Sequence, residues 1–226
     1  MAVRQKKNSP PNSSMPRITK LKAQRNPNYV NIFVDGHFET SLDLVVVTKL
    51  GLKVGTDVSG PALKILKKES EFAKLFNRAL HFLSFRPRSE KEVRDHFLKG
   101  WKMESEAPER KKIINELINK LKEKNLLNDR DFAVWWVQQR REFRQKSKWA
   151  IAAELRQKGI EAEIIEEVLS DTSDAKTARL IAEKKVKSLV RENRDKARLK
   201  LGSFLGRRGF NWEIIHAVVD ELIPRE

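Results

Sequence analysis

One helical pattern occurs three times in this 226-residue sequence, and the repetition restricts the possible folds more than any other feature. Pairs of isoleucines begin at Ile113, Ile164 and Ile214, so the repeat length is about 50 residues. In each copy further apolar residues follow three to five positions later, which places them on one face of a helix. A period of this length predicts tandem structural repeats that dock against one another.

A glycine followed by an apolar residue precedes each isoleucine pair, at Gly100-Trp101, Gly159-Ile160 and Gly209-Phe210. A lysine or arginine stands directly before each glycine, as expected where a helix ends in a left-handed glycine cap. The first glycine lies thirteen residues before its pair, the others five. The first repeat therefore has an extra loop of roughly eight residues around Glu104 to Glu109.

A longer apolar helix opens each repeat, and capping residues separate the helices. Ser89-x-x-Glu92 is typical of a capping box. The predicted N-caps elsewhere are Asn128 or Asp129, Ser173 and Asn211. The predicted fold class is mainly α: three tandem three-helix repeats form an elongated array, preceded by a small hairpin-containing α+β unit. A single compact helical bundle is the alternative. The predicted repeats span residues 69–127, 128–171 and 172–226.

The N-terminal part has a different pattern. Residues 1–16 are polar and basic and predict a disordered tail. Residues 17–68 predict the α+β unit, in which Asp35-Gly36 between alternating segments indicates a β-hairpin. Leu42 to Leu50 fits either a strand or a helix face, and we favour a helix with Ser41 as its N-cap.

The charge indicates an anionic partner. The chain has 47 Lys and Arg against 31 Asp and Glu, a net charge of +16. Nucleic acid, a nucleoprotein or an acidic membrane surface would suit this surplus. Residues 138–158 contain seven cations and two carboxylates, and residues 173–210 contain twelve cations and four carboxylates. The third helix of the second and third repeats is acidic instead. The basic helices form either a phosphate-binding stripe or simply solvated faces.

Two tryptophan sites differ in what they predict. Trp135 and Trp136 are adjacent on a helix, so one is expected in the core and the other partly exposed. Trp149 lies among Lys146, Lys148 and Arg156, and it is the better candidate for a contact with a partner.

The sequence lacks the common signatures of catalysis. It has no cysteine, no P-loop, no G-x-S-x-G elbow and no zinc-binding histidine pair. A nuclease would need a cluster of metal-binding carboxylates, which the pattern does not indicate. We therefore expect a binding protein, without cofactor or metal, and not an enzyme. No export signal or membrane span is present in the sequence, and a cytoplasmic location is expected.

Three motifs resemble those of the RecX family, regulators of the recombinase RecA, over roughly residues 70–223. They are Ala79-Leu80-x-Phe82-Leu83-x-x-Arg86-x-Arg88-Ser89-x-x-Glu92-Val93, then Leu126-Leu127-Asn128-Asp129-x-x-Phe132-Ala133, then Glu154-Leu155-x-x-Lys158-Gly159-Ile160. Residues 17–60 are similar to the β-containing extension of longer members. One departure is Lys146-Ser147-Lys148-Trp149, where members often carry a glycine.

The resemblance implies a monomeric regulator of recombination, DNA repair and the SOS response that lies along the groove of a RecA–DNA filament. Members usually restrain the ATPase and strand-exchange activities of RecA. Weak, salt-dependent binding to single- and double-stranded DNA is expected, and a membrane is not. The alternative is an architectural DNA-binding protein that acts without RecA. The predicted contact residues are Arg86, Arg88, Arg140, Arg141, Arg144, Lys146, Lys148, Trp149, Lys158, Lys184, Lys185, Arg207 and Arg208.

Overall fold

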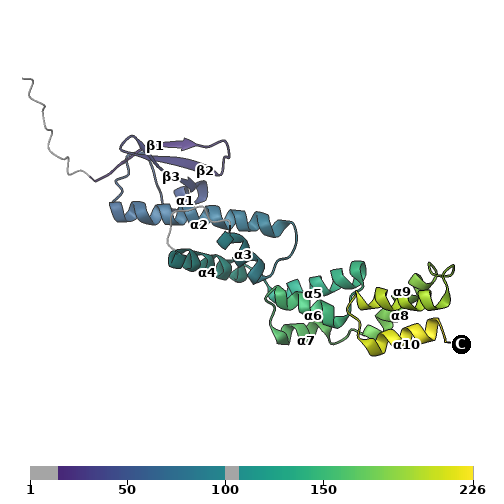
Figure 1. Ribbon diagram of the computed structural model, residues 1–226. Coiled ribbons are helices and arrows are strands. Elements are labelled where there is room, and N and C mark those ends of the chain that lie inside the picture. Colours follow the sequence, from purple (N-terminus) through teal and green to yellow (C-terminus); the bar gives the residue numbers. More distant parts are fainter. Residues whose placement is uncertain (1–14, 100–106, 226) are drawn as a thin grey trace, which may run out of the picture. The chain divides into compact units, whose positions relative to one another are not determined.

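The computed structural model describes residues 15–99 and 107–225 (Figure 1). The chain divides into two compact units, Met1–Leu80 and His81–Glu226. The tail predicted for residues 1–16 lies outside the described residues except for Met15 and Pro16. Gly100-Trp101 and the start of the loop predicted around Glu104 also lie outside them.

The first unit contains a three-stranded antiparallel sheet, in the order β1 (Ile18–Ala23), β2 (Tyr29–Val34) and β3 (His37–Asp43). Asp35 and Gly36 connect β2 to β3 with φ values of 49° and 85°. Positive φ at both positions is what a two-residue hairpin turn needs, so the predicted hairpin is confirmed.

A short helix, α1 (Leu44–Lys49), follows β3 directly. The helix predicted in this segment is confirmed, but its predicted N-cap is wrong. The side chain of Asp43 accepts a hydrogen bond from the backbone N–H of Val45 and caps the helix. Ser41 lies instead in β3, opposite Asn31, because β3 continues two residues further than the pattern indicates.

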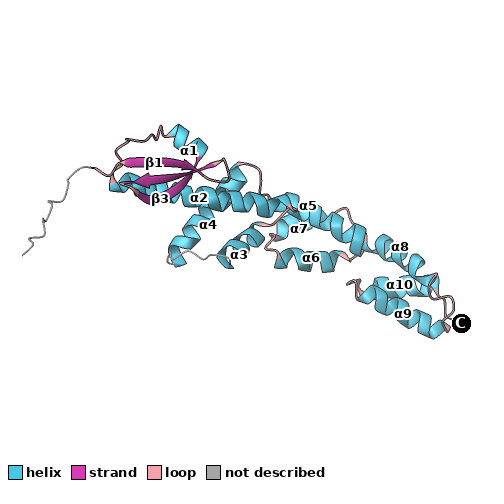
Figure 2. Ribbon diagram, turned by 90° about the horizontal axis from the view of Figure 1, so that it is seen from above, coloured by secondary structure: helices cyan, strands magenta, loops and turns pink. Residues whose placement is uncertain are grey.

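The core of the first unit lies between the sheet, α1 and the beginning of α2 (Gly60–Ser84) (Figure 2). Val30, Ile32 and Val34 alternate along β2 and are all buried, as a strand with one covered face requires. Leu66 of α2 packs into the same cluster. The helix α2 then runs without a break past residue 68, the predicted end of the α+β unit.

The second unit contains three successive groups of helices, which we name repeats 1, 2 and 3 (Figure 1). Repeat 1 comprises the end of α2 from His81, α3 (Glu90–Lys99) and α4 (Ala107–Glu123). Repeat 2 comprises α5 (Asp129–Gln139), α6 (Lys148–Gln157) and α7 (Ala162–Leu169). Repeat 3 comprises α8 (Asp174–Val186), α9 (Arg194–Gly206) and α10 (Trp212–Leu222).

Repeats 2 and 3 each have a hydrophobic core of their own. Ile165 and Leu169 of α7 are buried in the core of repeat 2, and Ile215, Val218 and Val219 of α10 in the core of repeat 3. These are the residues that the repeated pattern assigns to a core-facing helix stripe. The predicted fold class, mainly helical with three-helix repeats and a small α+β unit, is confirmed.

The caps and aromatic residues follow the sequence prediction in most places. Side chains of Asn128, Ser173 and Asn211 accept hydrogen bonds at the starts of α5, α8 and α10. Trp136 is buried and Trp135 half-buried, as predicted for the adjacent pair. Leu80 of α2, a residue of the first of the three motifs, is exposed.

Candidate interaction surface

The two junctions between successive repeats are built alike, around a buried serine. Ser89, the N-cap of α3, accepts a hydrogen bond from the backbone N–H of Glu92 and donates one to the carbonyl of Lys158 at 2.7 Å. Ser147, the N-cap of α6, donates in the same way to the carbonyl of Gly209 at 2.6 Å. Each hydroxyl therefore caps one helix and also holds the end of the middle helix of the next repeat.

An aspartate from the next repeat completes each junction. Asp129 accepts a hydrogen bond from the backbone N–H of Glu90 at 2.7 Å, and Asp174 accepts one from that of Lys148 at 2.8 Å. Both N–H groups belong to the first turn of a helix, where no partner within the helix exists. Burial raises the pKa of Asp129, against the lowering effect of this hydrogen bond.

A glycine lies where the two backbones approach most closely. Gly159 and Gly209 have φ values of 80° and 84°, so both predicted left-handed caps are confirmed. A Cβ on Gly159 would lie 2.8 Å from Cβ of Lys91, and one on Gly209 would lie 2.7 Å from Cβ of Ala150. Glycine is therefore required by contact between repeats as well as by backbone conformation.

The junction of repeats 1 and 2 carries an ionic cluster centred on Glu92. Arg86 donates two hydrogen bonds to its carboxylate, both at 2.9 Å, and the ammonium of Lys158 donates another at 2.5 Å. Burial disfavours the charged form of Glu92, but the hydrogen bonds from Arg86 and Lys158 outweigh it and lower its pKa to about 2. The predicted capping box is thus half formed, because Glu92 binds these cations instead of the Ser89 backbone.

A second ionic cluster surrounds Glu154 in repeat 2. Its carboxylate accepts hydrogen bonds from the indole N–H of Trp136 at 2.8 Å and from Arg140 at 2.6 Å, and Lys146 also pairs with it. The Arg140 guanidinium lies 4.0 Å from the Trp136 ring centroid. Although burial opposes ionisation, these donors lower the pKa of Glu154.

These clusters divide the predicted contact residues into two groups. Arg86, Arg140, Lys146 and Lys158 are bound to carboxylates inside the chain, where they hold helices together. Two more are partly covered by aromatic rings, Arg88 over Phe82 at 4.0 Å and Arg208 over Phe204 at 3.7 Å. Burial lowers the pKa of both guanidinium groups. Their Nε atoms are buried and have no hydrogen-bond partner in the described residues.

The other predicted contact residues are more accessible. Among them, Arg141, Arg144, Lys184 and Arg207 are exposed and have no ion pair in the described part of the chain. Lys148 and Lys185 are half-buried, and the Trp149 side chain is 71% exposed. This second group is the part of the prediction that a partner could reach directly.

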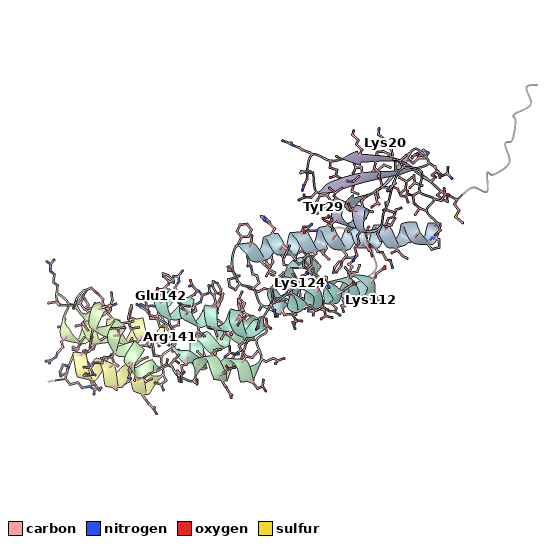
Figure 3. All side chains as sticks on the ribbon, turned by 180° about the vertical axis from the view of Figure 1, so that it is seen from behind. Lys20, Tyr29, Lys112, Lys124, Arg141 and Glu142 are labelled. Atoms are coloured by element: carbon pink, nitrogen blue, oxygen red, sulfur yellow. The ribbon has the colours of Figure 1, made fainter. Side chains whose placement is uncertain are left out.

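Arg141 and Arg144 lie in a short π-helix, η1 (Arg140–Arg144), which extends α5. The segment ends at Gln145, whose φ of 50° turns the backbone into the left-handed region before Ser147 caps α6. A wider helical turn of this kind presents its side chains differently from an α-helix and is frequent at functional sites. Arg141 and Glu142 project from it (Figure 3).

An apolar groove of about 580 Å³ lies between repeats 2 and 3 beside η1. Its apolar residues include Val134 of α5 and Leu180 of α8, both exposed, and its polar ones include Arg141 and Glu142. Sequence reasoning missed this groove. The available signal was that Val134 and Leu180 are apolar but lie off the core-facing stripes of their helices.

The described residues contain no group of three or more Asp, Glu or His side chains arranged to hold a metal ion. In the same residues, no helix combines the length and apolar character of a membrane span.

Four family models match the chain in order. They describe the regulatory protein RecX N-terminal domain, at residues 16–59, and the first, second and third three-helix domains of RecX, at residues 76–99, 128–169 and 173–219. The matched ranges include both junction serines, Ser89 and Ser147, and both junction glycines, Gly159 and Gly209. Together the matches cover most of the chain.

Individual proteins and structures agree with these models. The chain is 34% identical over 216 residues to the regulatory protein RecX of Bacillus subtilis, covering 92% of this chain and 78% of that protein. Its identity to the RecX of Clostridium botulinum strain Eklund 17B is 33%, over 94% of this chain and 99% of that protein. A crystal structure of a regulatory protein RecX superimposes with a TM-score of 0.68 at 22% identity, covering 91% and 100% of the two chains.

Proposed function

The chain belongs to the RecX family of regulatory proteins, and from this membership we propose that it regulates the recombinase RecA. In this proposal it binds in the groove of the RecA–DNA filament as a monomer in the cytoplasm. It restrains ATP hydrolysis and strand exchange by RecA, within recombination, DNA repair and the SOS response, and it performs no catalysis itself.

The observation that carries this proposal is that some cations are paired with carboxylates inside the chain, whereas others are exposed and unpaired. Carboxylates inside the chain neutralise Arg86, Arg140, Lys146 and Lys158, so these residues fix neighbouring helices. Exposed cations such as Arg141, Lys184 and Arg207 remain on repeats 2 and 3. Repeats that each make a modest contact with a long anionic polymer gain affinity from being linked.

The groove between repeats 2 and 3 favours a filament coated with protein over bare DNA. Apolar side chains such as Val134 and Leu180 gain little from a phosphate backbone, but they can bury an apolar side chain of a protein. Arg141 at the same groove can pair with an acidic neighbour of that side chain. This combination suits a polypeptide surface that is partly acidic.

The RecA ATPase measures the proposed function directly. With RecA assembled on single-stranded DNA, the full chain should slow ATP hydrolysis and strand exchange at amounts well below one per RecA subunit. Unchanged rates together with tight binding to bare DNA would instead establish the alternative, an architectural DNA-binding protein. The exposed Trp149 is the observation in favour of that alternative, because an exposed indole can stack on bases.

Charge reversal of Arg141 and Arg144 to Glu should weaken binding to the RecA–DNA filament about tenfold or more, with helicity unchanged. Both side chains are exposed and have no ion pair in the described residues, so their loss breaks no internal salt bridge. Filament binding is measured by co-sedimentation and by the protein concentration that halves the ATPase rate.

The matched control reverses two other exposed cations, Lys112 of α4 and Lys124 directly after that helix (Figure 3). It makes the same change in net charge at a distance from η1 in the sequence. An equal loss of binding in both double variants would show that only total charge matters and would remove η1 from the proposed contact.

A further inference from the structure

The outer face of the N-terminal sheet carries a pair of aromatic rings, one exposed and one half-buried, that the proposed function does not use. The inner face of β2 covers the core of the unit, whereas Phe33 points to the opposite face. Phe38 of β3 lies directly opposite Phe33, with ring centroids 5.9 Å apart at an interplanar angle of 74°. The Phe38 side chain is 57% exposed.

The strand register extends this pair into a row across all three strands. Lys20 of β1, labelled in Figure 3, lies opposite Phe33 on its other side. The Lys20 ammonium is 5.8 Å from the Phe33 ring centroid. Lys22 follows two positions along β1 and is also exposed. With neighbouring strands about 4.8 Å apart, the row of Lys20, Phe33 and Phe38 spans about 10 Å.

Two irregularities in strand pairing flank Phe33 and fix this arrangement. The register shifts between Ile18 and Lys20 in β1, and at Glu39 in β3. The hydroxyl of Thr19 accepts a hydrogen bond from the backbone N–H of Gly36 at 2.9 Å and donates one to the carbonyl of Phe33 at 3.3 Å. Bulges redirect side chains, and here they bring one cation and two rings onto the same face.

Carboxylates of the same unit do not neutralise these lysines. Glu39 is paired with Lys67 at 2.7 Å, and Asp57 is paired with Arg17 at 2.6 Å. Within the described residues, neither Lys20 nor Lys22 has an ion pair. The face therefore presents aromatic rings beside uncompensated positive charge.

From this row we propose that the outer sheet face binds single-stranded nucleic acid. A base stacks on the exposed Phe38 ring, which Phe33 holds through its edge-to-face contact, while Lys20 and Lys22 contact the flanking phosphates. An aromatic sheet surface suits unpaired bases, because a duplex hides the base faces that such rings contact. This inference goes beyond the proposed function, since it gives the N-terminal unit a ligand of its own that requires no RecA.

The test uses the full chain and a fluorescein-labelled 20-mer of oligothymidylate, with binding followed by fluorescence anisotropy. Phe38→Ala should weaken binding about tenfold, and Phe38→Leu by a similar factor because it keeps apolar area but removes the ring. The control Phe85→Ala removes a phenylalanine that is 69% exposed in the second unit, and it should bind as the unchanged chain does.

Two further measurements separate stacking from charge. A 20-mer abasic strand should bind the Phe38→Ala variant and the unchanged chain equally, because it has phosphates but no bases. Lys20→Gln should weaken binding to both strands and reduce the slope of log affinity against log salt by about 0.7. Ultraviolet crosslinking of oligothymidylate should label the peptide that contains Phe33 and Phe38.

Several results would overturn the inference. One is equal affinity of the Phe38→Ala variant and the unchanged chain for oligothymidylate, with crosslinks confined to the helical repeats. Another is a loss of affinity of the Phe38→Ala variant for the abasic strand that equals its loss for oligothymidylate, which would exclude stacking. Binding of a polyglutamate of the same length, as tight as that of oligothymidylate and likewise lost in Phe38→Ala, would assign the face to an acidic protein segment. The RecA ATPase assay remains independent, so this inference and the proposed function can fail separately.

Discussion

Gly209→Ala is expected to lower the free energy of unfolding by about 3 kcal/mol, which corresponds to a melting temperature about 8 °C lower. An alanine at a φ of 84° costs roughly 1–2 kcal/mol in backbone strain. Its Cβ would also lie 2.7 Å from Cβ of Ala150 and 2.8 Å from the hydroxyl of Ser147. Both atoms are close to the α6 backbone, so neither can move away without disturbing the junction of repeats 2 and 3.

Gly206→Ala provides a matched control three residues earlier. Gly206 lies in α9, and a Cβ added there would have Cδ1 of Ile215 as its nearest neighbour, at 3.9 Å, which is an ordinary contact. The control should therefore leave stability unchanged or raise it by up to about 1 kcal/mol. Circular dichroism at a helix-sensitive wavelength during thermal unfolding measures both variants. An unshifted midpoint for Gly209→Ala would show that the close approach between repeats does not limit stability.

The repeats can be predicted because residues close together in the sequence determine the helices of each repeat and their ends. The helix stripe around Ile164 and Ile214 and the glycines that end α6 and α9 depend only on residues a few positions apart. The same holds for the turn at Asp35-Gly36. The prediction of Ser41 as a cap is wrong because the end of β3 is set by its pairing with β2, which local spacing does not reveal.

The candidate surface is less predictable, because the role of a cation depends on what lies opposite it in space. Lys158 and Glu92 are 66 positions apart in the sequence and yet form an ion pair at 2.5 Å. From sequence alone, Lys158 and Arg207 are both basic residues near a helix end. Only the docking of repeat 2 on repeat 1 shows that one is neutralised inside the chain and the other is exposed.

The same contacts explain why the capping box is only half formed. In a complete box the Glu92 carboxylate would accept a hydrogen bond from the backbone N–H of Ser89. Hydrogen bonds from charged donors are roughly twice as strong as those from neutral ones, so Arg86 and Lys158 bind the carboxylate instead. Ser89 and Glu92 have the spacing of a capping box, but the Glu92 carboxylate stabilises the junction between repeats 1 and 2 instead.

Glu92→Gln is expected to lower the free energy of unfolding by about 2 kcal/mol at neutral pH. The glutamine keeps the size of the side chain but removes the charge that binds Arg86 and Lys158, and the two cations then repel each other at a partly buried site. Chemical unfolding followed by circular dichroism measures the loss. Glu166→Gln, at an exposed position of α7, is the control and should change stability by less than about 0.5 kcal/mol.

The pH dependence gives this prediction a second and independent readout. The pKa of Glu92 is about 2 in the folded chain against 4.5 as its ordinary value, so the unfolded chain binds a proton at higher pH than the folded one. The stabilisation from ionised Glu92 is therefore complete above about pH 4.5 and is lost as the pH falls from there toward 2. Glu92→Gln should remove this part of the acid sensitivity, so the stability difference between the two proteins should shrink over that interval. A difference that stays constant from neutral pH down to about pH 2 would show that the carboxylate charge does not hold the first two repeats together.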